Sequence, residues 1–435
     1  MEQLHITGGV QLTGTLSISG SKNATLPAMA AALLTDQPVE LLNVPIIEDI
    51  DTMAAMLRHL GVEVEQVGRS EWRLQAQQVE SRQVGADLTR RLRGSLLLLG
   101  ALVARTGEAR IARPGGDDIG MRRAEQHLEG LRAMGADVVE QDDWYIARSR
   151  RLRGARIDLD MPTVTGTENL MMAAVLAEGI TVISNAAREP HVVDLARCLL
   201  GMGARISGAG TELIVIEGKG GLLHGTRHSV TTDYIEAGTY MVAAAVTRGD
   251  VVVDHMRPAD VRWLINKLRA AGCEVIEGSS HIRVRGADRL RAVDVTTWPH
   301  PGFATDLQSQ FVALMTQAHG TSVVSEAVFE NRFRHVDELR KLGASISVEG
   351  RSAVIAGPAR LHGARVRVPD IRSGAALVIA ALSAEGTSVL DDVYHLDRGY
   401  EKMTAKLRAL GAQVDRVVLA STGVAERDFS GVIGD

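Results

Sequence analysis

One pattern of apolar and polar positions recurs six times along this chain of 435 residues. In each copy, an amphipathic helical segment ends in a glycine, and a short stretch of alternating apolar and polar residues follows. Glycine is typical of the position just beyond a helix, where the backbone turns left-handed, and a period of two is that of a strand. By subtraction, the spacings are 74, 68, 69, 71 and 68 residues between Gly61, Gly135, Gly203, Gly272, Gly343 and Gly411.

A second pattern lies between these copies. Alanine-rich segments that are apolar on all sides run through a polar turn into β-branched strands, as in 28–34 to 39–42, 171–176 to 181–183, 241–246 to 251–253, and 375–382 to 388–390. A helix that is apolar all round is a buried helix. The two patterns together predict six α/β modules gathered around buried helices. Because the chain is too long for one ordinary core, we expect three modules in each of two domains.

Composition narrows the function classes. A hydrophobic share of 45% and a charged share of 23% are typical of a soluble globular protein. The net charge of −5 and the aromatic share of 3% argue against a nucleic-acid partner. Cys198 and Cys273 lie far apart in apolar surroundings and indicate buried thiols rather than disulfides. We see no signal peptide and no apolar run of about 18 residues, so we expect a cytoplasmic protein without a membrane partner.

The stretch 113–123, Arg-Pro-Gly-Gly-Asp-Asp-Ile-Gly-Met-Arg-Arg, is the most unusual segment. Its glycines allow the backbone to come close to a ligand. Arginine forks suit phosphate, and a carboxyl group on such a loop, Asp117 or Asp118, can exchange protons. A surface turn with solvated charges is the alternative that the local sequence leaves open.

Other cationic residues precede helices at corresponding places in their repeats. Lys22 follows Gly20-Ser21 at a predicted helix start, which Ser21 can cap and where anions are favoured. If equivalent ends of the modules face one centre, a single cationic cleft suited to a phosphate-rich ligand is lined by Lys22, Arg93, Arg122, Arg372 and Arg398. Taken singly, each is equally well explained as a solvated charge or a structural ion pair.

Candidate carboxylates and ligand cradles are less clear from local sequence. Asp49 and Asp51 lie in a polar turn before a helix, where capping is the expected role. Asp306 follows a proline-stiffened turn at 299–305 and fits a helix cap and a base in a cleft equally. His224 and His228 are four residues apart but lie in a glycine-rich turn rather than on a helix face, so we predict no metal site.

Six ordered motifs carry a family resemblance. They lie at residues 20–24, 114–120, 185–190, 299–306, 328–333 and 395–401. On these motifs the chain resembles, from residue 1 to about 418, the UDP-N-acetylglucosamine 1-carboxyvinyltransferases, enolpyruvyl transferases that begin peptidoglycan synthesis. The resemblance implies an α/β fold, a two-domain inside-out α/β barrel of six βαβαββ repeats that is EPSP synthase-like. It implies domains at 22–229, with a mobile loop at 113–123, and at 1–21 plus 230–419. We expect 420–435 to be a flexible tail.

The resemblance also implies roles for matching residues. Asp306 would take the proton from the sugar 3-hydroxyl, and Asp117 would protonate the enolpyruvyl methylene. Phosphoenolpyruvate would be held by Lys22, Asn23, Arg122 and Arg398, with help from Arg372; Lys22 and Arg398 also count as catalytic. The substrate-binding set, mostly for UDP-N-acetylglucosamine, adds Arg93, Arg123, Ala124, Glu125, Gln126, Met161, Pro162, Thr163, Val164, Val328, Arg332 and Asp370. No metal or organic cofactor is implied.

Position 117 departs from the commonest form of the family. Many members carry a cysteine there, and this chain, like a minority, carries Asp117. A carboxylic acid can deliver a proton if its pKa is raised; burial and Asp118 would raise it, and nearby arginines would lower it. Asp118 is a second possible acid. Because fosfomycin alkylates the loop cysteine of the family, the resemblance implies resistance to that drug.

Two other functions stay open at this point. One is enolpyruvyl transfer to a different acceptor, such as shikimate 3-phosphate or a free nucleotide, although the 114–120 loop argues against the shikimate enzyme. The other is a non-catalytic relative that only binds a UDP-sugar. The presence of Lys22, Asp306 and Arg398 together argues against it, because a binder need not keep acid, base and phosphate clamp.

Overall fold

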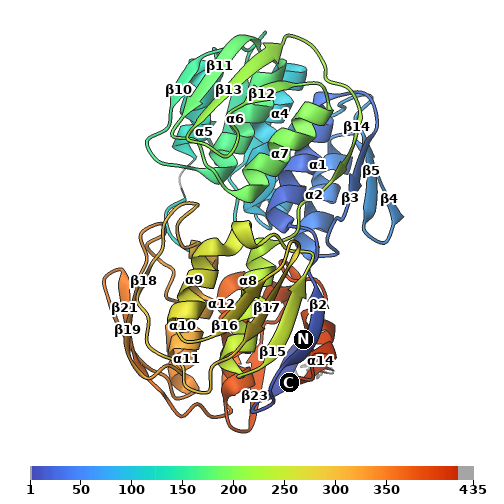
Figure 1. Cartoon of the computed structure of the whole chain (residues 1–435). Helices are drawn as coiled ribbons and strands as arrows, with labels where there is room; N and C mark the ends of the chain where they lie inside the picture. The colour runs from blue at the N-terminus through green and yellow to red at the C-terminus, as the bar shows by residue number, and fades with distance from the viewer. Residues whose placement is uncertain (1, 123, 420–435) are drawn as a thin grey trace, which may run out of the picture.

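The structure is a computed structural model that describes residues 2–122 and 124–419. It shows two bodies, each with β-sheets on the outside and helices inside (Figure 1). This confirms the predicted two-domain inside-out α/β barrel. The prediction of a flexible tail at 420–435, and the candidate residue Arg123, lie outside the described residues.

Six four-stranded sheets surround the two sets of helices. In the first body their strand orders are β14 (Thr226–Ser229), β3 (Val39–Leu42), β5 (Glu71–Gln75), β4 (Glu63–Gly68); β6 (Gln83–Val84), β7 (Glu108–Ala112), β9 (Trp144–Arg148), β8 (Asp137–Gln141); and β10 (Arg156–Asp158), β11 (Glu178–Ser184), β13 (Leu213–Lys219), β12 (Arg205–Ser207). In the second body they are β16 (Glu274–Glu277), β17 (His281–Arg285), β15 (Asp250–Asp254), β2 (Thr13–Ser17); β18 (Val295–Thr296), β19 (Gly320–Ser325), β21 (Ser352–Gly357), β20 (Ser345–Glu349); and β22 (Arg365–Arg367), β23 (Thr387–Asp391), β1 (Glu2–Thr7), β24 (Gln413–Val418).

All six sheets share one topology, in which one edge strand runs parallel to its neighbour and the other pairings are antiparallel. Three sheets are completed by strands distant in sequence. β14 pairs with β3, β2 pairs with β15, and β1 lies between β23 and β24, with Glu2 opposite Val418. The chain start therefore supplies the strand that the last repeat lacks.

One buried helix and one amphipathic helix belong to each repeat, as the two sequence patterns predict. The buried helices are α1 (Lys22–Ala31), α4 (Leu97–Thr106), α6 (Val164–Leu176), α8 (Tyr234–Val246), α10 (Gln308–Met315) and α12 (Ile371–Ser383). The amphipathic helices are α2 (Glu48–His59), α5 (Glu125–Ala133), α7 (Pro190–Gly201), α9 (Arg262–Ala270), α11 (His335–Lys341) and α14 (Met403–Ala409).

The six repeat glycines follow these amphipathic helices with φ between 88° and 101°, which confirms the predicted left-handed position. Short helices complete the described elements: α3 (Ala86–Thr89), α13 (Tyr394–Asp397), and the 3-10 turns η1 (Ala32–Leu34), η2 (Arg93–Leu96), η3 (Pro258–Val261) and η4 (Thr305–Leu307). No described helix combines the length and the apolarity that crossing a membrane requires.

Two separate hydrophobic cores form. One contains buried residues from Ala24 to Val230, and the other contains Leu4 to Ile18 together with Tyr234 to Val414. The chain passes between the bodies twice, and the two passages lie side by side. The Ser21 amide donates to the Thr231 carbonyl at 2.8 Å, and the Asp233 amide donates to the Ser19 carbonyl at 3.0 Å.

Candidate active site

Lys22 stands at the start of the buried helix α1, where the two bodies meet. The Ser21 hydroxyl caps this helix by accepting a hydrogen bond from the Ala24 amide at 3.3 Å, as the sequence predicts. Gly20 is required here, because a Cβ at this position would lie 1.6 Å from the Asn43 carbonyl oxygen. The cap and the close approach fix Lys22 at a helix N-terminus, which already favours an anion.

Asp49 joins cations from both bodies. Its carboxylate contacts Lys22 Nζ at 3.1 Å through one oxygen and Arg398 Nε at 3.1 Å through the other. The predicted capping role is wrong, because Ile47 is at the cap position of α2 and Asp49 lies inside the first turn. A side chain at a helix start can contact the other body just as well as it can cap its own helix. Two acids at the start of a helix were therefore a visible but ambiguous signal.

Asp117 of the 113–123 loop points into the same cluster. Its carboxylate contacts Arg398 Nη1 at 2.6 Å, and its carbonyl accepts a hydrogen bond from Arg122 Nη2 at 3.2 Å. Burial would raise the pKa of Asp117, but Arg398, Lys22 and Arg122 outweigh burial, and its pKa lies below the ordinary value. Asp117 is therefore a carboxylate in this arrangement. The sequence left open whether burial or the nearby cations would dominate its pKa, and here the cations dominate.

Asp118 faces the other way. Its side chain is 73% exposed, against 14% for Asp117, and its partner is Arg334 at 3.6 Å. The neighbouring loop backbone binds the second body, because the Asn331 amide donates to the Ile119 carbonyl at 3.2 Å. Glu330 accepts a hydrogen bond from the Met121 amide. Of the two adjacent carboxylates, Asp117 therefore faces the cationic cluster, and Asp118 lies where the loop contacts the second body.

Asp306 lies in η4 and pairs with two arginines that are both almost fully buried. Arg332 donates to one oxygen of its carboxylate, and Arg372 Nη2 approaches the other at 3.2 Å. The capping interpretation of Asp306 is wrong, because the residue before η4 is Ala304 and no side chain caps this turn. The structure thus places Asp306 between these two cations.

Electrostatics hold Asp306 as a carboxylate. Burial would raise its pKa, but Arg372, Arg332 and Lys22 lower it far below the ordinary value. Arg372 shows the reciprocal effect: burial would lower its pKa, and Tyr400, Asp306 and Asp233 raise it instead. The Nη1 atom of Arg372 is buried without a hydrogen-bond partner among the described residues. This nitrogen is an unused donor beside the carboxylate.

The segments predicted to hold the UDP-sugar adjoin each other. The Arg93 guanidinium donates to the Arg122 carbonyl, and burial and Arg122 lower the pKa of Arg93 to about 10. Gln126 Oε1 accepts a hydrogen bond from the Met161 amide at 3.4 Å, and Thr163 caps α6. Ala124 and Glu125 stand at the start of α5 and Val164 at the start of α6; Pro162 lies within the same 161–164 segment.

The remaining candidates have structural partners. The Asp370 carboxylate caps α12 by accepting from the Arg372 and Ser373 amides at 2.9 and 3.0 Å. Asn23 follows Lys22 in α1. The Val328 amide donates to Glu326 at 2.8 Å, and Thr305, next to Asp306, donates to the same carboxylate at 2.9 Å. Sequence analysis missed Glu326, which ties the Asp306 turn to the Val328 segment; nothing in its local sequence marks it.

The arrangement can bind anions and move protons. Lys22, Arg122, Arg332, Arg372 and Arg398 outnumber the three carboxylates that pair with them, so positive charge remains for a ligand. The five cations come from both bodies, so an anion held by them would also hold the bodies together. Asp117 and Asp306 lie within electrostatic reach of the same Lys22. Two carboxylates near one anion site are suited to giving and taking protons on a bound substrate.

Comparisons with known proteins agree with this reading of the fold. A family model described as EPSP synthase (3-phosphoshikimate 1-carboxyvinyltransferase) matches residues 6–407. The crystal structure of the enolpyruvyl transferase NikO from Streptomyces tendae is similar with a TM-score of 0.87 and 27% identity, covering 96% of this chain and 99% of that one. EPSP synthase from Acinetobacter baumannii is similar with a TM-score of 0.75 at 19% identity, over 96% of this chain and 100% of that one, which shows the shared fold.

Proposed function

The chain belongs to the EPSP synthase family of enolpyruvyl transferases, and from that premise we propose that it acts on UDP-N-acetylglucosamine. The reaction is transfer of the enolpyruvyl group of phosphoenolpyruvate to the sugar 3-hydroxyl with release of phosphate, in the cytoplasm, as the first committed step of peptidoglycan synthesis. The observation that carries this proposal is a cluster across the two bodies. In it Arg398 pairs with Asp117 and with Asp49, Asp49 also pairs with Lys22, and Asp306 lies within electrostatic reach of Lys22.

The cluster supports a specific division of labour. Phosphoenolpyruvate binds Lys22, Arg122 and Arg398, and its negative charge replaces that of Asp117 as their partner. Asp306 accepts the proton of the 3-hydroxyl while the oxygen attacks C2, and Asp117 gives a proton to C3. The tetrahedral adduct then collapses: Asp117, now a carboxylate, takes a proton back from C3, the C2–C3 double bond forms again, and the C2–O bond to phosphate breaks. The cations stabilise the departing phosphate.

Substrate binding itself makes Asp117 an acid in this scheme. Without a ligand, Arg398, Lys22 and Arg122 hold its pKa below the ordinary value in spite of burial. A bound anion neutralises these cations, so burial becomes the dominant influence and the pKa of Asp117 rises. The proton donor is thus formed only when the group that needs the proton is present.

We also propose that the protein resists fosfomycin, because the loop has a carboxylate at position 117 in place of a thiol. Cys198 and Cys273 are both buried in the hydrophobic cores, where neither offers an accessible thiol. Asp117→Cys tests this directly. We expect covalent labelling of that variant by the drug and none of the wild-type protein; labelling of the wild type would contradict the proposal.

Transfer to another acceptor is a second candidate. It is supported by the description of the family model and by the similarity to NikO, an enolpyruvyl transferase, at 27% identity. The discriminating experiment measures phosphate release from phosphoenolpyruvate with UDP-N-acetylglucosamine, with shikimate 3-phosphate, with uridine monophosphate, and with no acceptor, each before and after fosfomycin treatment.

Each result has a clear meaning. Release that requires UDP-N-acetylglucosamine and survives the drug supports both the acceptor and the role of Asp117. Release with another acceptor only would replace the proposed substrate. Absence of release with every acceptor, combined with calorimetric binding of the UDP-sugar, would favour the non-catalytic alternative.

A further inference from the structure

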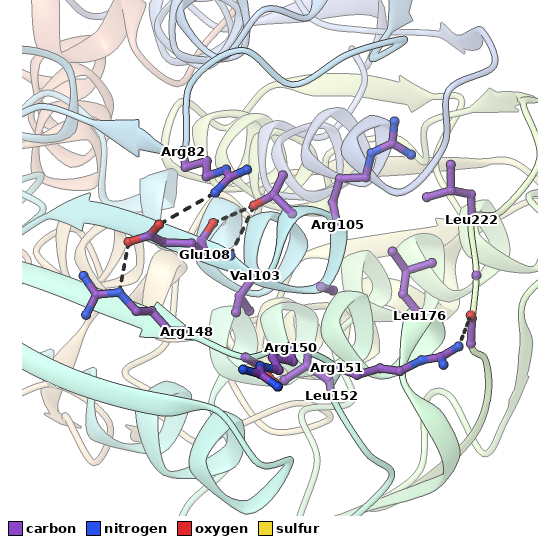
Figure 2. A pocket seen from close by; sticks show the side chains of 16 residues that line it. Arg82, Val103, Arg105, Glu108, Arg148, Arg150, Arg151, Leu152, Leu176 and Leu222 are labelled. Carbon is purple, nitrogen blue, oxygen red and sulfur yellow. Dashed lines mark hydrogen bonds and ion pairs between the residues drawn. The ribbon is translucent and has the colours of Figure 1, made fainter.

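A hollow of about 870 Å³, shown in Figure 2, lies in the first body. It lies at the opposite end of the buried helices from the candidate active site. The hollow is lined by the ends of α4 and α6, at Thr106 and Leu176. The candidate active site adjoins the starts of the same two helices. The ten residues of α4 separate the two by about 15 Å at 1.5 Å per residue. Its volume is within the range of small-molecule sites.

Arginine dominates the polar lining of this hollow. Arg82 and Arg148 share Glu108, at 3.8 and 3.0 Å, and Arg151 pairs with Glu178 at 2.6 Å. Arg150 has no hydrogen bond or ion pair with any described residue. With Arg105, five arginines line the hollow: Arg82, Arg105, Arg148, Arg150 and Arg151. Arg82, Arg148 and Arg151 together pair with only two carboxylates, so an excess of positive charge remains on this concave surface.

Arg105 adds an unsatisfied donor. It lies in the last turn of α4, and its Nη2 donates to the Ala76 carbonyl at 3.1 Å. Its Nη1 is buried and has no hydrogen-bond partner within residues 2–122 and 124–419. The helix end accounts for a cation at this point. It accounts neither for the unsatisfied nitrogen nor for the gathering of four further arginines from two other segments.

The floor of the hollow is apolar. Val103, Leu152, Leu176 and Leu222 contribute apolar side chains to the lining (Figure 2). A site with guanidinium groups around an apolar floor matches a ligand that has both phosphate groups and a carbon body. We propose that this hollow binds a small organic phosphate with at least two negative charges. This proposal is independent of the acceptor used in the active site.

The test is calorimetric titration of the full chain with ADP, an organic diphosphate, and with inorganic pyrophosphate at low salt. Arg148→Ala/Arg150→Ala removes two guanidinium groups from the 148–152 segment of the lining. The matched control, Arg360→Ala/Arg365→Ala, removes the same charge from exposed ion pairs on the second body. Arg398→Ala removes a cation of the cleft. We expect ADP to bind about tenfold or more weakly to the hollow variant and within about twofold of wild type to the other two.

Three results would overturn the proposal. They are no binding of either probe at millimolar concentration, equal losses in the hollow variant and the matched control, and loss in Arg398→Ala with retention in Arg148→Ala/Arg150→Ala. The last result would assign the bound diphosphate to the cleft. We further expect ADP to bind more tightly than pyrophosphate, because only ADP has a body for the apolar floor.

Discussion

The two ends of the first body's helices hold similar ion pairs in different surroundings. At the starts, Lys22 and Asp49 are 3.1 Å apart with side chains 11% and 3% exposed. At the ends, Arg148 and Glu108 are 3.0 Å apart but 52% and 30% exposed. The two pairs have nearly equal distances but should contribute differently to stability, because water screens the exposed Arg148–Glu108 pair and not the buried Lys22–Asp49 pair. The comparison teaches that burial, rather than contact distance, decides what losing one partner costs.

The largest effect on activity should come from the buried pairs at the helix starts, which we call the inner region, at the proposed acid Asp117. Asp117→Asn keeps the shape of the side chain and removes the proton donor. We expect turnover to fall by about 10² to 10⁴-fold while UDP-sugar binding stays nearly unchanged. Phosphate release and calorimetry measure the two effects. The matched control is Asp118→Asn on the adjacent exposed residue; if both variants lose activity equally, the distinction between the two carboxylates is wrong.

Removal of the bridging carboxylate tests the comparison itself. Asp49→Asn leaves Lys22 and Arg398 without their shared partner, and we expect a loss of about 3 kcal/mol in the free energy of unfolding. Glu108 in the hollow also pairs with two cations, and we expect Glu108→Gln to lower the free energy of unfolding by less than about 1 kcal/mol. Denaturant unfolding of both variants measures these values. Similar losses at the two ends would show that burial does not separate them.

Acid pH should affect the inner region selectively. The pKa of Asp117 and that of Asp306 are both lowered in the folded protein, so their contribution to stability is complete above the ordinary value of 3.8 and is lost as pH falls below it. We expect Asp117→Asn and Asp306→Asn each to flatten the decline of the melting temperature below about pH 4. An unchanged slope in both variants would contradict this assignment.

The smallest effect is expected where the loop contacts the second body. Arg334→Ala removes an exposed partner of Asp118 at 3.6 Å. Exposed pairs contribute little, so stability should change by less than about 1 kcal/mol. The apparent affinity for phosphoenolpyruvate should fall only a few-fold, because the Asn331 contact still holds the loop. A loss of turnover comparable with that of Asp117→Asn would make Asp118 and Arg334 part of the chemistry.

Sequence reasoning succeeded where local backbone chemistry decides the structure. Glycine after a helix and serine before one have few alternatives, so the six left-handed glycines and the Ser21 cap were predictable. The two helix patterns predicted the buried and amphipathic helices for the same reason, since periodicity reports which faces are covered.

It was less successful where a role depends on distant partners. Asp49 resembles a cap in its own segment, and its contact with Arg398 joins positions 349 residues apart in sequence. The resting protonation of Asp117 depends on cations from three segments. The arginine hollow is assembled from five segments, none with a local signal. Each of these features exists only after the repeats are placed around their helices.

The position of β1 has a consequence for the order in which the protein is made. This strand leaves the ribosome well before its neighbours, β23 and β24, which are among the last parts of the described chain to be synthesised. The first body can complete its sheets once β14 has emerged, whereas the second body must wait for β23 and β24. During that interval the N-terminal strand has no sheet to join. Assembly of the cationic cluster, which needs Arg398, therefore also waits for this late part of the described chain.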